Sequence, residues 1–171
     1  MGAGIIVWAT VAHRFGLLMP QINDFLQAAS SFAQTTTPYV GLFGITTCNL
    51  ILARQFNQHR ELDKVPGVYI FSVPESGRVL YIGESEGLFG RFIQHSGRAA
   101  RFNTDGECFP NFDLIKNYHW ATPETKQVIK SGNFHVHVIL VEPPTMRWLL
   151  ESFLIAYGRA NGNPPELNVR G

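Results

Sequence analysis

Residues 67–95 read GVYIFSVPESGRVLYIGESEGLFGRFIQH, and this stretch determines how the 171-residue chain is interpreted. Apolar, β-prone residues predict one strand over residues 68–73 and a second over residues 79–82. Between them, residues 74–77 read PESG, which are residues that turns favour. The sequence therefore predicts an antiparallel β-hairpin.

A helix is predicted directly after this hairpin, over residues 88–94. Arg91 and His95 lie four positions apart, so they share one face of such a helix. We expect that face to be directed toward the two strand tyrosines, Tyr69 and Tyr81. A guanidinium, an imidazole and two phenols around one small site are groups suited to handling phosphate.

Two further elements are predicted downstream. Residues 134–141 alternate in the manner of a third strand. Pro143, Pro144 and Thr145 predict the start of a long helix that has Thr145 as its N-cap and ends near Gly158. The expected fold is therefore α/β, with a small three-stranded antiparallel sheet flanked by helices and an insertion over residues 97–132.

The N-terminal part differs in character, and we predict a helical extension over residues 1–63 followed by the main module over residues 64–171. One helix is expected from Pro20 through Phe32 and another over residues 49–57. The sequence TTTP at residues 35–38 predicts a break between them, because the residue before a proline avoids the helical region. This extension is interpreted either as a cover for the core or as a DNA-binding segment.

Composition limits the classes of function. The chain is 45% hydrophobic and 16% charged, with a formal net charge of +1, so any surface that binds nucleic acid must be local. Cys48 and Cys108 have no metal-binding spacing and are expected to be free or buried thiols. The apolar runs near the start are interrupted by polar residues, so we expect a soluble, cytoplasmic protein without a membrane partner.

Six pieces of the sequence occur in a fixed order. They are Gly67-Val68-Tyr69, Tyr81-Ile82-Gly83, Arg91, His95, Glu151 and Asn168. In order and in approximate spacing they resemble the GIY-YIG endonucleases, and the resemblance covers residues 64–171. None of the pieces is specific alone, but their combination is.

The resemblance implies hydrolysis of a DNA phosphodiester bond with one divalent cation, Mg²⁺ or Mn²⁺. Glu151 would be the metal ligand, as a lone carboxylate suits a hard cation that keeps most of its waters. Arg91 would contact the scissile phosphate and stabilise the charge that develops there. Asn168 would orient the substrate or fix the local backbone. Glu84, directly after Tyr-Ile-Gly, departs from the family pattern and would either turn outward or help to hold the metal.

The resemblance leaves the general base open. Tyr69 would lie beside the attacking water and either deprotonate it or orient it, which requires a phenol with a lowered pKa. His95 would instead deprotonate the tyrosine or take the water proton. Tyr81 would form a hydrogen bond to the phosphate or to waters of the metal. A second histidine used by some members has His119 as its nearest candidate.

The insertion mixes basic and aromatic residues, a composition that suits phosphate contacts combined with base stacking. A loop-rich layer packed over the core is the alternative interpretation. The residues expected to contact DNA are Arg98, Arg101, Lys116, Trp120 and Lys126.

The sequence thus predicts metal-dependent cleavage of DNA, with restriction-type double-strand cutting as the leading hypothesis. Two alternatives stay open: a nuclease specific for DNA structure or for single strands, and a nucleic-acid-binding protein built on a nuclease scaffold. One site per chain would need a homodimer, or sequential nicking, to cut both strands.

Overall fold

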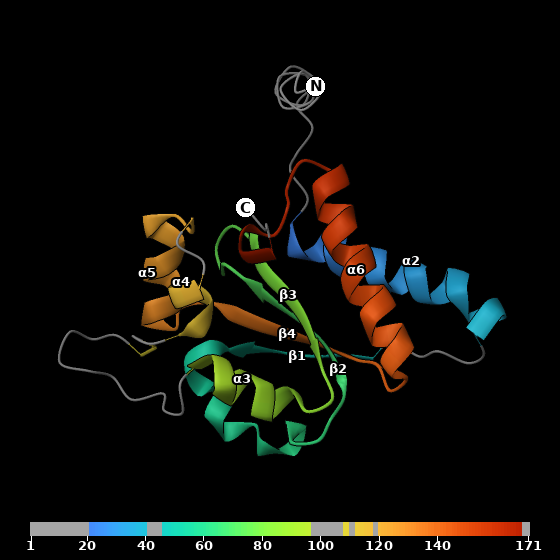
Figure 1. Ribbon diagram of the computed structural model, residues 1–171, viewed down its shortest axis with the longest axis horizontal. Helices are drawn as coiled ribbons and strands as arrows, with labels where there is room; N and C mark the ends of the chain where they lie inside the picture. Colours follow the sequence, from blue (N-terminus) through green and yellow to red (C-terminus); the bar gives the residue numbers. More distant parts are fainter. Residues whose placement is uncertain (1–20, 41–45, 97–107, 110–111, 118–119, 169–171) are drawn as a thin grey trace.

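The computed structural model describes residues 21–40, 46–96, 108–109, 112–117 and 120–168, which form a mixed α/β fold. Four antiparallel strands pair in the order β1-β4-β2-β3, with helices on both faces of the sheet (Figure 1). The strands are β1 (Thr46–Leu52), β2 (Gly67–Ser72), β3 (Val79–Ser85) and β4 (His135–Leu140). The helices are α2 (Ile22–Val40), α3 (Leu88–Ser96), α4 (Asp113–Asn117), α5 (Pro123–Ser131) and α6 (Pro144–Ala160), with 3-10 turns η1 (Ala53–Gln58), η2 (Arg60–Leu62) and η3 (Glu166–Asn168).

The predicted hairpin is confirmed. Strands β2 and β3 pair with Tyr69 opposite Gly83 and Phe71 opposite Tyr81. Gly77 closes the turn with a φ of 64°, a left-handed conformation that glycine adopts without steric penalty. The predicted third strand is also confirmed as β4, which pairs along the other side of β2.

The prediction of three strands was wrong, because β1 adds a fourth strand. The helix expected over residues 49–57 is absent, and that region forms the end of β1 followed by η1. Strand β1 pairs with β4 and so covers an edge that β4 would otherwise expose. A short apolar run fits a buried strand as well as a buried helix, so periodicity could not separate the two.

The break predicted over residues 35–38 was also wrong, since α2 continues to Val40. The Thr35 and Thr36 hydroxyls donate hydrogen bonds to the carbonyl oxygens of Ser31 and Phe32, at 2.9 and 2.8 Å. Threonines bonded back to the preceding turn are compatible with a helix. Helix α6 differs in a smaller way: Thr145 is not its N-cap, because Pro143 occupies that position.

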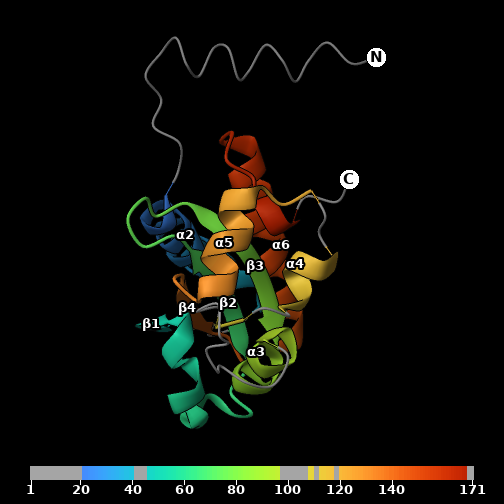
Figure 2. The same cartoon turned by 90° about the vertical axis from the view of Figure 1, so that its left-hand side faces the viewer.

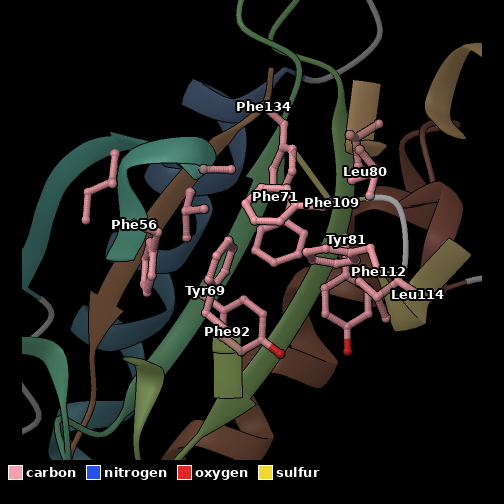
Figure 3. Close-up of a cluster of buried hydrophobic side chains, with 14 of the residues drawn as sticks. Phe56, Tyr69, Phe71, Leu80, Tyr81, Phe92, Phe109, Phe112, Leu114 and Phe134 are labelled. Carbon is pink, nitrogen blue, oxygen red and sulfur yellow. The ribbon is translucent and has the colours of Figure 1, made fainter. Parts of the chain in front are cut away.

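The sheet divides the interior into two cores. On one face, Val68 and Ile70 of β2 and Ile82 of β3 pack with α2 and α6. On the other face lie Tyr69, Phe71 and Tyr81, together with aromatic side chains from α3 and from the segments around α4 (Figure 3). Figure 2 shows α4 and α5 in front of the sheet on this second side.

The described part of the N-terminal segment belongs to this framework. Phe25 and Phe32 of α2 form ring contacts with Tyr157 and Phe153 of α6, at centroid distances of 5.4 and 4.9 Å. Phe25 is fully buried. Helix α2 therefore covers the core beside α6, which is one of the two roles expected for this segment.

Gly67 offers a test of the sheet, because a Cβ atom placed there would overlap the Ile139 carbonyl of the neighbouring strand. We expect Gly67→Ala to lower the free energy of unfolding by about 1–3 kcal/mol or more, as overpacking of a close contact does. Urea denaturation measures it. Gly90→Ala is the matched control: apart from its chain neighbours and its own helix backbone, no atom of the described residues lies within 4 Å of the added methyl group, so it should be neutral or stabilising. Equal stabilities of the two variants would contradict the close packing at Gly67.

Candidate active site

The two motif tyrosines lie on neighbouring strands and on the same face of the sheet. Their ring centroids are 5.9 Å apart, and their side chains are only 4% and 8% exposed. Their hydroxyl oxygens lie at the same edge of the aromatic cluster (Figure 3). Tyr69 and Tyr81 therefore present two polar ends at one boundary of an otherwise apolar core.

Gly83 allows this arrangement. A Cβ atom at position 83 would lie 2.6 Å from the Tyr69 hydroxyl oxygen and 2.8 Å from Cε1 of Tyr81. Any larger residue would displace the tyrosine side chains, so the two rings can pack directly against the backbone only because position 83 is a glycine.

Helix α3 brings its imidazole to Tyr69. His95 is 1% exposed, and its Nε2 atom lies 2.8 Å from the Tyr69 hydroxyl oxygen. The other ring nitrogen, Nδ1, lies 2.6 Å from Oδ1 of Asp113, at the start of α4. A carboxylate, an imidazole and a phenol are thus joined in one chain of hydrogen bonds. Asp113 was not predicted as a site residue; it lies 18 positions after His95 within the insertion.

Arg91 is exposed one turn before His95 on α3 and also reaches Tyr69. Its Nη1 atom donates a hydrogen bond to Oε1 of Gln94 at 3.1 Å. Burial acts to lower the pKa of Arg91, but the tyrosines and Asp113 beside it raise that pKa above its ordinary value. The guanidinium therefore remains a fixed positive charge beside the two tyrosines.

Burial raises the pKa of Tyr69 well above its ordinary value, and the neighbouring Tyr81 adds to this rise. The charge of Arg91 and its hydrogen bond act in the opposite direction but do not outweigh burial. In the protein alone, Tyr69 is consequently a neutral phenol, and its O–H group can donate to His95 Nε2. The lowered pKa expected from the sequence is not present in this state.

Glu151 approaches from the opposite face of the sheet. It lies on α6, which packs on the face of the sheet opposite to the tyrosines. Because β3 is an edge strand of the described sheet, side chains from the two faces can meet beyond it. Burial raises the pKa of the half-buried Glu151, the neighbouring Glu84 adds to this rise and Arg91 opposes it, which together bring the pKa to about 7. The carboxylate thus lies within electrostatic range of both the arginine and a second carboxylate.

Glu84 is held in place by a buried arginine. Arg147, one turn before Glu151 on α6, is 3% exposed, and its Nε atom lies 3.2 Å from Oε2 of Glu84. Its Nη1 atom donates to the carbonyl oxygen of Glu142 at 2.7 Å. The side chain of Glu84 therefore faces α6, and the sequence did not reveal its arginine partner.

Among the described residues, no three potential ligand side chains gather into a group that could hold a metal ion. A Mg²⁺ ion bound largely through water and substrate phosphate does not need such a group. No hydrogen bond from a described side chain satisfies the carboxylate of Glu151, whose pKa is raised by burial beside Glu84. An incompletely neutralised carboxylate of this kind fits a hard divalent cation.

Asn168 is engaged by the backbone of β3. Its Oδ1 atom accepts a hydrogen bond from the Ile82 amide at 2.7 Å, and its Nδ2 atom donates to the Ile82 carbonyl at 2.8 Å. The pair fastens the C-terminal segment to the edge strand beside Tyr81. Of the two roles expected for Asn168, this geometry corresponds to fixing the local backbone, and its assignment as a catalytic residue stays a prediction.

Of the five residues expected to contact DNA, the structure describes the side chains of Trp120 and Lys126. Arg98, Arg101 and the candidate histidine His119 lie outside the described residues. Lys116 belongs to α4, with its side chain outside the described part, and Lys126 is partly buried on α5.

Trp120 is 36% exposed and lines a surface hollow of about 340 Å³ with Arg78 and Glu166. Its indole N–H donates to the Glu166 carbonyl oxygen at 3.4 Å. A partly exposed indole beside a hollow could receive a base, so the assignment of Trp120 to DNA contact stays a prediction.

Comparisons with protein-family models, with curated proteins and with solved structures give no match for this chain. In the part of the chain that the structure describes, no helix has both the length and the apolar character needed to cross a membrane. Cys108 is a free, buried thiol.

Because no comparison gives a match, the function is inferred from the geometry around Tyr69.

Proposed function

We propose that this chain is a metal-dependent endonuclease of the GIY-YIG type that hydrolyses DNA phosphodiester bonds. The supporting observation is the 2.8 Å contact between the Tyr69 hydroxyl and His95 Nε2, with Arg91 beside it and Glu151 across the edge strand. A proton relay, a fixed cation and a carboxylate available for a metal are groups suited to metal-assisted phosphodiester hydrolysis.

Glu151 would hold the divalent cation, Mg²⁺ or Mn²⁺. When bound, this cation would polarise the scissile phosphate and stabilise the charge that develops on it. Arg91 contributes its guanidinium to the same phosphate, because a planar set of donors matches phosphate oxygens better than a point charge. Its exposure leaves it accessible to a DNA backbone.

Tyr69 and His95 share the proton transfer in this proposal. As the attacking water loses a proton to the Tyr69 oxygen, the phenolic proton passes to Nε2 of His95, so the phenol never carries a full negative charge. This route agrees with the direction in which burial moves the pKa of Tyr69. The tyrosine positions the water, and the histidine receives the proton.

Target choice falls to other parts of the chain, because phosphate contacts position a protein on DNA without specifying sequence. We propose that the insertion, through residues such as Trp120 and Lys126, contacts the DNA beside the site. Restriction-type cleavage of both strands is the leading form of the proposed activity, with a homodimer or sequential nicking supplying the second cut.

Incubation of supercoiled plasmid with the protein tests this function. We expect nicked or linear product with Mg²⁺ or Mn²⁺ and none with EDTA. Duplex, single-stranded and branched substrates of the same sequence distinguish a duplex endonuclease from a structure- or single-strand-specific one. DNA binding in a gel shift without cleavage of any substrate would instead favour a nucleic-acid-binding protein on a nuclease scaffold.

A further inference from the structure

His95 is bonded at both ring nitrogens while almost entirely removed from solvent. Nδ1 faces the carboxylate of Asp113 at 2.6 Å, and Nε2 faces the hydroxyl of Tyr69 at 2.8 Å. The imidazole ring also stacks on Phe112, with ring centroids 5.8 Å apart and planes 16° apart. Its orientation is therefore set by three contacts, two of which come from consecutive residues of the insertion.

The chemistry of these partners selects one tautomer of His95. A carboxylate only accepts hydrogen bonds, so Nδ1 must carry a hydrogen toward Asp113. In the neutral ring Nε2 is then an acceptor, and the Tyr69 O–H group donates to it. A histidine with the opposite tautomer would present an N–H group to Tyr69 and could not receive its proton.

We propose that Asp113 is the positioning residue of this site, holding His95 in the tautomer that accepts a proton from Tyr69. This inference rests on the proposed function and deepens it. Asp113 touches neither the water nor the phosphate and acts through the imidazole. It also stabilises the imidazolium that forms when the proton arrives, as a carboxylate does in other three-membered relays.

The insertion then has a second role, because it supplies Asp113 to the site. Asp113 lies on α4, which packs against α3, and it also acts electrostatically on Arg91. The insertion that we expect to contact DNA therefore carries one member of the relay. Docking of α4 against α3 completes the site, so chemistry depends on a segment that the minimal hairpin and helix do not contain.

Asp113→Asn tests this role, because asparagine keeps the size of the side chain but can offer an N–H group to Nδ1. We expect single-turnover cleavage at saturating DNA to fall by on the order of 10²-fold, the lower end for loss of a proton-transfer group. Affinity for the same DNA in a gel shift should stay within a few-fold of the wild type. A merely structural role would affect both measurements or neither.

The tautomer itself provides a readout that does not depend on cleavage. In protein labelled with ¹⁵N-histidine, His95 should show a protonated Nδ1 and an unprotonated Nε2, and Asp113→Asn should change this pattern. A His95→Gln variant assigns the resonances. If the wild type cleaves no DNA, the proposed function fails, while the nitrogen resonances of wild type and variant still decide whether Asp113 sets the tautomer.

Glu61→Gln is the matched control, because Glu61 forms a similar 2.7 Å contact with Nδ1 of His59 on the surface. It should alter neither cleavage nor the resonances of His95. A wild-type His95 protonated at Nε2 would overturn the proposal. Loss of cleavage in Asp113→Asn with unchanged His95 resonances would also overturn it, and so would wild-type cleavage by that variant.

Discussion

Glu151→Gln is expected to abolish Mg²⁺-dependent cleavage while DNA binding persists. Glutamine keeps the size and polarity of the side chain but is a poor ligand for a hard cation. Because a catalytic metal contributes several kcal/mol to phosphoryl chemistry, we expect a fall of at least about 10³-fold in single-turnover cleavage. Nicking assays and gel shifts on one preparation measure the two properties together.

The same substitution should stabilise the metal-free protein at neutral and alkaline pH. The pKa of Glu151 is raised from 4.5 to about 7, so the folded state binds this proton more tightly than the unfolded state. The stabilisation from the bound proton is full below about pH 4.5 and is lost as the pH rises through 7. The advantage of the glutamine variant should therefore grow from pH 5 to pH 8, reaching about 1–2 kcal/mol after allowance for partial exposure.

With Mg²⁺ bound, the wild type should become more stable than Glu151→Gln. Mg²⁺ bound to the folded wild type raises its melting temperature by mass action, and Glu151→Gln should lose that response. Glu86→Gln is the control, because Glu86 is 85% exposed and lies near the same arginine, Arg147. A Glu151→Gln variant that cleaves like the wild type, or that keeps the Mg²⁺ response, would remove Glu151 from the metal site.

The part of the site formed by the hairpin and α3 could be predicted from the local sequence. Tyr69, Tyr81, Arg91 and His95 lie within 27 consecutive residues, where strand pairing and helical periodicity fix which side chains meet. The predicted approach of His95 to the tyrosines corresponds to its 2.8 Å contact with Tyr69, and Arg91 acts electrostatically on both tyrosines. Short-range periodicity is the part of a fold that a sequence expresses directly.

Other contacts of the site are long-range in sequence and could not be predicted. The bond between Arg147 and Glu84 joins residues 63 positions apart, and the bond between Asn168 and Ile82 spans 86. Asp113 lies 18 positions after His95, within an insertion that has no periodic pattern to place it. The strand β1 was missed for a related reason, since its partner β4 lies far along the chain. Such contacts depend on tertiary packing, which outweighs local preference.

Tyr69→Phe is expected to lose about 10²- to 10⁴-fold in single-turnover cleavage, the range for removal of a group that transfers a proton. Phenylalanine keeps the ring and its packing against Phe71 and Tyr81, so the loss would be due to the hydroxyl alone. The change also leaves Nε2 of the buried His95 without its partner. Urea denaturation should show a destabilisation of about 1–3 kcal/mol and an intact fold.

Tyr157→Phe is the control for Tyr69→Phe. Tyr157 packs on Phe25 in the other core, so its hydroxyl is remote from the relay, and cleavage should stay within a few-fold of the wild type. Circular dichroism spectra of both variants must match the wild type for the comparison to be valid.

Comparison with His95→Gln decides which of the two residues is the general base. In a relay, the tyrosine and the histidine act as one unit, so each single variant and the double variant should lose similar activity. If instead His95 deprotonates water directly, Tyr69→Phe would retain most activity and His95→Gln would not, because Nε2 is left free to accept the proton. A Tyr69→Phe variant within a few-fold of the wild type would thus reduce the tyrosine to scaffold. The 2.8 Å contact would then serve to hold the imidazole in place.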